Sequence, residues 1–328
     1  MISGGARNLL RMGVLALLWG STFLWITVAL DGFTPAQVTF VRCALGAAAL
    51  LLACRLAGHR LPTDPSIWRH LAVAAFLCNA LPFALFSLGQ RTVDSGTAGV
   101  LNATTPLWSL LLGLAIGAER DLRPIRLGGL LLGFAGVVTI FAPWRHGGLV
   151  SWNALAILGA AVSYAAAFAY LGRTLVGRGV PTIVLSSAQL LAATGWSALF
   201  LPVGGLDAPR VTMASVGALV VLALGCTAVT FHLTYKIITH EGATNAASVG
   251  YLLPVVSVTL GALLLDEPVT IRMTVGMVVV LLGVGLTRWP PRAPEAPPAA
   301  EVGHSPARRP VADPADAGPA AAAGTRAG

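Results

Sequence analysis

Two basic side chains on one helix face are the first feature that could do chemistry. His232 and Lys236 are four residues apart in an apolar stretch, so on a helix they lie on the same face. Facing inward, they could hold the carboxylate of a solute, and His232 could exchange a proton near neutral pH. Alternatively, Lys236 marks the end of a helix and His232 bonds a backbone carbonyl.

Arg42 lies inside another apolar run, TFVRCALG. An arginine at the centre of a membrane helix costs about 2.5–3.5 kcal/mol, so it needs a partner or a water-filled path. It could contact an anion. It could also extend to the membrane interface, or pair with a helix-end carbonyl or with Asp31.

The acidic residues avoid the apolar stretches. All thirteen stand at or beyond the ends of these stretches or in the C-terminal segment. Proton-driven carriers commonly use a buried carboxylate, so a carboxylate relay is disfavoured and His232 is the one intramembrane group left for proton coupling. The four cysteines form no CxxC pair, which predicts neither a disulfide framework nor a metal site. No cofactor is indicated.

The composition indicates whether the protein lies in water or in a lipid bilayer. Of 328 residues, 56% are hydrophobic and 10% charged, whereas a soluble domain carries about 25% charged residues. This excludes a soluble enzyme or nucleic-acid-binding domain and leaves the bilayer. The net charge of +8 comes from scattered arginines and one lysine, without a basic run, so no nucleic-acid partner is expected.

Ten apolar stretches are long enough to cross a bilayer, which takes about 20 residues each. Their lengths predict an all-α integral membrane protein rather than a barrel of short alternating strands. From Pro290 the sequence turns rich in proline and alanine, which predicts a disordered tail over 290–328. The stretches are 12–30, 34–56, 69–89, 96–117, 124–142, 152–172, 181–202, 212–237, 244–265 and 268–287.

An internal repeat divides the chain. Residues 98–120 align with residues 246–268 at an offset of 148, so that Pro106 matches Pro254 and Glu119 matches Glu267. We predict two five-helix repeats, 8–146 and 150–288. An odd number of helices in each repeat inverts the second copy, as in many secondary transporters. The two prolines are expected to bend their helices and shape a cavity.

The ten stretches, the two halves, the motif WGSTF near the first helix and the paired Pro…Gly…Glu blocks resemble the drug/metabolite transporter superfamily, EamA branch. The resemblance covers residues 8–288. It implies a ten-helix inner-membrane carrier that moves a small metabolite, often outward. An arginine after an aromatic residue is frequent in that family at the place of Arg42, which favours a structural role for it.

The resemblance also implies a cavity lined by particular helices. Polar groups at depth should face other helices or a cavity, because they cost free energy in lipid. Aromatic residues would form the walls and asparagines would orient the solute. The residues expected there are Trp19, Thr22, Asn79, Phe83, Asn102, Tyr164, His232 and Tyr251.

Two smaller features have two interpretations each. Glu119 and Glu267 could act as gates at opposite membrane faces, but capping of the next helix is favoured. Gly129 and Gly133 could form a dimer face, although such pairs more often mark close packing within one chain. The oligomeric state therefore stays open.

The sequence predicts a secondary transporter, an exporter or facilitator of a small metabolite such as an amino acid, that works by alternating access. Its partners are the solute and the lipid bilayer, and it is not expected to be an enzyme. The alternative is a membrane-embedded enzyme that uses His232 on a lipid-linked substrate. Such an enzyme should have a cluster of His, Asp or Glu at one depth, which this sequence lacks.

The positive-inside rule predicts the orientation. With the N-terminus inside, thirteen Arg and Lys lie near the inner ends of the stretches and four near the outer ends. Reporter fusions after Trp289 and near Gly58 should therefore report the cytoplasm, and fusions near Arg145 and Asp207 the outside. A C-terminus outside the cytoplasm would contradict both the even number of spans and the inverted repeat.

Overall fold

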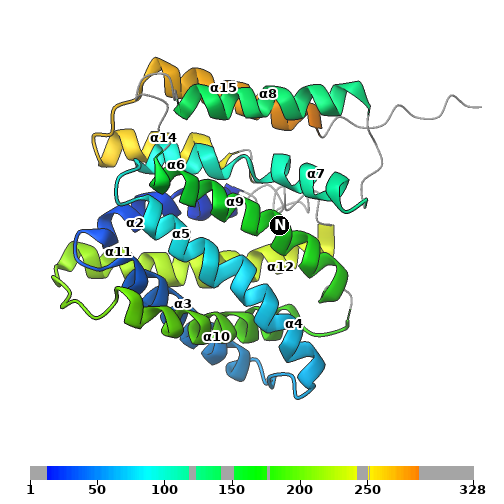
Figure 1. Cartoon of the computed structure of the whole chain (residues 1–328). Helices are drawn as coiled ribbons and strands as arrows, with labels where there is room; N and C mark the ends of the chain where they lie inside the picture. Colours follow the sequence, from blue (N-terminus) through cyan, green and yellow to red (C-terminus); the bar gives the residue numbers. More distant parts are fainter. Residues whose placement is uncertain are drawn as a thin grey trace, which may run out of the picture. The chain divides into compact units, whose positions relative to one another are not determined.

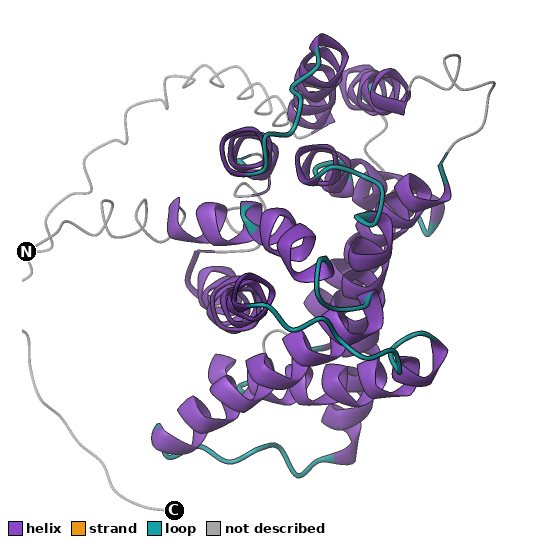
Figure 2. Ribbon diagram, turned by 90° about the vertical axis from the view of Figure 1, so that its left-hand side faces the viewer, coloured by secondary structure: helices purple, strands orange, loops and turns teal. Residues whose placement is uncertain are grey.

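A computed structural model describes residues 13–117, 123–141, 151–175, 178–241, 250 and 252–287. Every regular element in these ranges is a helix, and Figure 2 shows only helices and connecting loops. Glu119, Tyr251 and the predicted tail lie outside the described residues.

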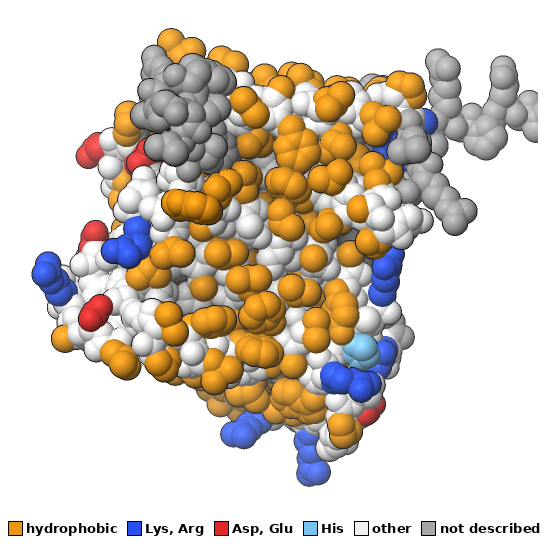
Figure 3. Space-filling view, viewed as in Figure 1, with side chains coloured by type: hydrophobic (Ala, Val, Ile, Leu, Met, Phe, Trp, Pro, Cys, Tyr) orange, Lys and Arg blue, Asp and Glu red, His pale blue; other side chains and the backbone are white. Residues whose placement is uncertain are grey.

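Seven helices are long and apolar enough to cross a membrane, and three further apolar helices are shorter. Together they correspond to the ten predicted stretches, which confirms the all-α, ten-helix fold. Figure 3 shows hydrophobic side chains over the middle of the visible face and charged ones toward its margins. This distribution suits a protein surrounded by lipid between two aqueous layers.

The first five spans follow one another as in Figure 1. The first, Gly13–Leu30, ends with α2. The third and fourth spans each contain an interruption, which is discussed with the site below. The elements are α2 (Thr22–Leu30), α3 (Pro35–Leu56), α4 (Pro65–Ala75), η1 (Phe76–Ala80), α5 (Leu81–Gly89), α6 (Ser95–Asn102), α7 (Thr105–Ala115) and α8 (Pro124–Phe141).

The second five spans repeat this order. The eighth span of the chain is interrupted by a π-helical segment, and so is the third span. The elements are α9 (Trp152–Thr174), α10 (Thr182–Phe200), η3 (Leu201–Val203), α11 (Met213–Ala223), η4 (Leu224–Val229), α12 (Thr230–Glu241), α14 (Leu253–Leu264) and α15 (Ile271–Thr287).

Local signals fix several helix starts. Thr34 and Gln37 form a capping box at the start of α3, with Pro35 in the first turn. The Asp64 carboxylate accepts a hydrogen bond from the Ser66 N–H at 2.7 Å at the start of α4. Both arrangements satisfy amides that a helix leaves without an internal partner.

Helices α8 and α15, the last of each repeat, lie side by side (Figure 1). Glycines let their backbones touch: a Cβ on Gly283 would lie 2.7 Å from the Gly129 carbonyl oxygen, and one on Gly136 would lie 2.7 Å from the Val280 nitrogen. Gly129 and Gly133 therefore pack within the chain, as the sequence favoured.

We predict that Gly283→Leu destabilises the protein by about 1–3 kcal/mol, because the new side chain has no space against α8. Gly285→Leu on the same helix is the matched control, since no atom lies within 4 Å of its added Cβ. Thermal unfolding of both variants in detergent tests this. Equal midpoints for the two variants would contradict the packing.

Candidate functional site

Two π-helices occupy equivalent places in the two repeats. Segment η1 starts at Phe76 and η4 at Leu224, which is the offset of 148 that relates the repeats. At that offset Asn79 corresponds to Thr227, and both side chains are fully buried. Because π-turns inside α-helices are frequent at functional sites, these two positions are the starting point for the site.

Each of these side chains is bonded to the other repeat. The Arg42 Nε of α3 donates to the Thr227 Oγ1 at 2.6 Å. The Gln189 Nε2 of α10 donates to the Asn79 Oδ1 at 2.7 Å. Arg42 and Gln189 are each seven residues after the first residue of their helix, at an offset of 147, one residue less than the offset of the π-helices. The two hydrogen bonds therefore join corresponding helices of the two repeats. We call them the inter-repeat ties.

Arg42 is buried, with 2% of its surface exposed. Its Cζ lies 3.5 Å from the centroid of the Phe83 ring, a cation–π contact. Its Nη1 has no hydrogen-bond partner among the described residues. The expectation that Arg42 extends to the membrane interface is wrong, because Thr227 and Phe83 hold the guanidinium inside the helix bundle.

Around Arg42 the neighbouring groups are aromatic or weakly polar. The groups that interact with it electrostatically are the Tyr164 phenol and the thiols of Cys226 and Cys43. No carboxylate is among them. The positive charge therefore has no acidic partner within the described part of the chain.

The second tie continues into a chain of hydrogen bonds. The Tyr235 hydroxyl donates to the Gln189 Oε1 at 2.6 Å, and Gln189 donates onward to Asn79. The Nδ2 of Asn79 has no partner among the described residues. This chain joins α12, α10 and η1.

The structure brings some predicted cavity residues together. Phe83 and Tyr164 lie beside Arg42, Asn79 takes part in the second tie, and Tyr164 stacks on Phe168 with ring centroids 5.9 Å apart. We call the side chains of the two ties, with Phe83, Tyr164 and Tyr235, the polar core. Sequence reasoning missed Thr227, Gln189 and Tyr235. The signal for Thr227 was available, because it matches Asn79 in the repeat.

Other predicted residues make local contacts. Thr22 donates to the Leu18 carbonyl at 3.3 Å, and Asn102 contacts Thr105. Trp19 packs against Leu15 and Leu253 in a small apolar cluster.

The two remaining basic candidates, His232 and Lys236, are close enough for the Lys236 charge to act on the imidazole. His232 is half-buried and its Nδ1 lacks a partner among the described residues, whereas Lys236 is exposed. Burial therefore differs between two side chains that the spacing placed on one face.

Pro106 and Pro254 both stand in the first turn of a helix, α7 and α14. Before Pro106, the fourth span is interrupted at Ala103 and Thr104, between α6 and α7. A proline tolerates this position because its missing N–H would have no partner there. Pro106 thus begins a new helical segment after this interruption, whereas most residues before Pro254 lie outside the described ranges.

Away from this core, α6 and α14 are in contact across the repeats. A Cβ on Gly99 would lie 2.5 Å from the Ser257 Cβ, and one on Gly96 would lie 3.3 Å from the Val258 Cα. Glu267, which follows α14, accepts from the Ser95 N–H at 2.7 Å and from the Gly96 N–H at 3.0 Å. We call this carboxylate contact the Glu267 clasp.

The favoured interpretation of Glu267 is corrected by this contact. The sequence predicted that it caps the next helix, α15, but it caps α6 of the other repeat. The physical reason is that the turn at Asp266, with a φ of 53°, reverses the chain directly beside the start of α6. Glu119 lies outside the described residues.

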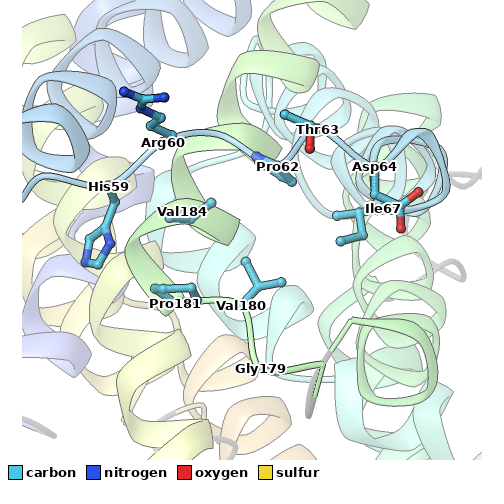
Figure 4. A pocket seen from close by; sticks show the side chains of 10 residues that line it. All are labelled: His59, Arg60, Pro62, Thr63, Asp64, Ile67, Gly179, Val180, Pro181 and Val184. Carbon is cyan, nitrogen blue, oxygen red and sulfur yellow. The ribbon is translucent and has the colours of Figure 1, made fainter.

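A cavity of about 340 Å³ lies between the segment after α3 and the segment before α10. Figure 4 shows Arg60 and His59 directed to opposite sides, with Val180, Pro181 and Val184 on a neighbouring segment. Asp64 already caps α4. These polar groups do not converge on a ligand, so this cavity is a weaker candidate than the polar core.

Many transporter folds are built from two such related halves of membrane helices. The chain belongs to the EamA-like transporter family, whose sequence pattern matches residues 9–142 and 151–289.

Relatives carry matching names. The uncharacterized transporter YvbV of Bacillus subtilis (strain 168) is 25% identical over 299 residues, 88% of this chain and 94% of its own length. The uncharacterized inner membrane transporter YedA of Escherichia coli (strain K12) is 26% identical over 306 residues, 86% of this chain and 92% of its own length. A solved crystal structure with 22% identity superposes with a TM-score of 0.60 and covers 86% of this chain and 96% of its own, which shows the fold. The protein is thus a multi-pass membrane transporter.

The second tie yields a prediction about stability. Gln189→Leu leaves the buried Asn79 amide and Tyr235 hydroxyl without this partner, whereas Asn79→Leu combined with Gln189→Leu removes both sides of the bond. We expect the double variant to be less destabilised than the sum of the single variants, by about 0.6–1.7 kcal/mol. Unfolding midpoints in detergent for the complete double-mutant cycle measure this coupling. Additive effects would contradict a direct bond.

Proposed function

We propose that this transporter exports a small metabolite, such as an amino acid or a related compound, or facilitates its movement, by alternating access. The observation that carries the proposal is the contact between α6 and α14. These helices belong to opposite repeats, and at this end their backbones approach too closely for a solute to pass between them.

The orientation belongs to the same proposal. With both termini in the cytoplasm, the α6–α14 contact lies at the outer end of the spans, so the outer path is closed. Opening it requires the Glu267 clasp to release. The interruption before Pro106 would then serve as the hinge between α6 and α7.

We propose that the solute path follows the helices that carry the polar core. A solute moving between the repeats meets the inter-repeat ties at the middle of the spans. The residues proposed to line the path are Trp19, Thr22, Asn79, Phe83, Asn102, Tyr164, His232 and Tyr251.

Reconstituted vesicles test this function. Vesicles loaded with a mixture of amino acids and related metabolites should lose particular solutes only when they contain the protein. Conversion of a lipid-linked substrate without flux of any solute would contradict the proposal and favour an enzyme that uses His232.

The Glu267 clasp gives a sharper prediction. Glu267→Gln removes a carboxylate worth about 1 kcal/mol at a helix N-terminus, so the outer end should open more often. The readout is labelling of Ser257→Cys, present in both proteins, by a membrane-impermeant maleimide. Ser257 is fully buried against α6, and we expect labelling about fivefold faster in Glu267→Gln.

Asp94→Asn is the matched control. Asp94 is an exposed acid at the same helix start, but its side chain makes no capping hydrogen bond. Desolvation and the nearby Glu267 charge raise the pKa of Asp94 above its usual value, which places a second carboxylate close to the clasp. Removing this charge should not speed the labelling. Equal acceleration by both substitutions would show that net charge, rather than the clasp, holds this end closed.

A further inference from the structure

The two inter-repeat ties join corresponding helices of the two repeats but differ in charge. Gln189 forms its tie to Asn79 with a neutral amide, whereas Arg42 forms its tie to Thr227 with a guanidinium. The second repeat thus provides an internal control. A neutral side chain is sufficient to join the repeats at this place, so the positive charge of Arg42 needs a different reason.

Stability does not provide that reason. Burying an ion without a partner costs several kcal/mol, and Arg42 is buried with no carboxylate among the described groups around it. An arginine cannot relieve this cost by losing its proton. The buried charge therefore lowers the stability of the fold, and we look for its role in another step of the protein's function.

One nitrogen of the buried guanidinium is left without a hydrogen-bond partner among the described residues. The Nε is bonded to Thr227 and the guanidinium face lies on the Phe83 ring, but the Nη1 has no such partner. Two N–H groups along one edge of an arginine match the two oxygens of a carboxylate or phosphate.

We infer that Arg42 receives the oxyanion, carboxylate or phosphate, of the transported solute. The inference rests on the proposed function and adds the chemical class of the solute. The Phe83 ring lies against the guanidinium, and Tyr164, which packs on Phe86, also interacts with it, so the rest of a bound solute meets apolar and aromatic surface. Thr227 fixes the guanidinium in advance, which lowers the entropy lost on binding.

The test compares matched solutes. Vesicles containing the full-length protein are loaded with L-amino acids, with their carboxamides, and with phosphate monoesters and their parent alcohols, and efflux is measured by mass spectrometry. The wild type should move the acid faster than its amide, or the phosphate faster than its alcohol, by at least about tenfold. The pair that shows the difference identifies the oxyanion.

Three variants separate binding from structure. Arg42→Gln copies the neutral tie of the other repeat and should abolish the preference for the anion. Arg42→Lys keeps the charge and should keep part of the preference. Gln189→Leu breaks the other tie without changing charge, so it should slow both members of a pair equally.

The outcomes are distinguishable from those that concern transport itself. Equal efflux of acid and amide, and of phosphate and alcohol, by the wild type overturns the inference while leaving transport intact. An unchanged preference in Arg42→Gln also overturns it. If Arg42→Gln does not fold, thermal stabilisation of the wild type in detergent decides: stabilisation by the anionic members alone supports the inference, and equal stabilisation by both members overturns it. Absence of any flux contradicts the proposed function and, with it, this inference.

Discussion

The inter-repeat ties are the interaction on which the arrangement of this chain depends. Within a bilayer there is little hydrophobic drive between helices, so packing of small residues and hydrogen bonds must hold them together. A π-turn in each repeat presents one buried polar side chain, Asn79 or Thr227, and neither finds this partner within its own repeat. Each repeat therefore completes the other at the middle of the spans.

The other contacts between the repeats are of two kinds. Helices α8 and α15 meet along glycines such as Gly136 and Gly283, and a side chain at either would clash with backbone atoms. The contact of α6 with α14 also relies on glycine, but a single surface-accessible carboxylate secures it. A contact held by one clasp beside a helix interruption is easier to open than a backbone seam, and this difference fits a fixed scaffold with a movable end.

Much of the fold could be predicted from the sequence, because the bilayer makes hydropathy decisive. The ten apolar stretches correspond to the ten helices, and the glycine spacing of α8 indicated its close packing. The Glu267 carboxylate caps α6 instead of the predicted helix, α15. Glu267 is close in sequence to α15, but the turn at Asp266 brings it to α6, and such a contact depends on how the repeats dock rather than on sequence distance.

The site was harder to predict, and the reason is local. Arg42 was identifiable because a charge in an apolar run is conspicuous, but Thr227 and Gln189 resemble the many small polar residues that only bond their own helix, as Thr230 and Thr234 do. A π-turn has no clear signature in one copy. The repeat supplies the missing signal. Asn79 and Thr227 occupy equivalent positions and are both polar and buried, which indicates a shared structural role. Of their two partners only Arg42 is charged, so the shared structural role does not explain its charge. One buried cation on a pseudo-twofold arrangement suits a single anionic solute, whereas two would repel each other in the empty state.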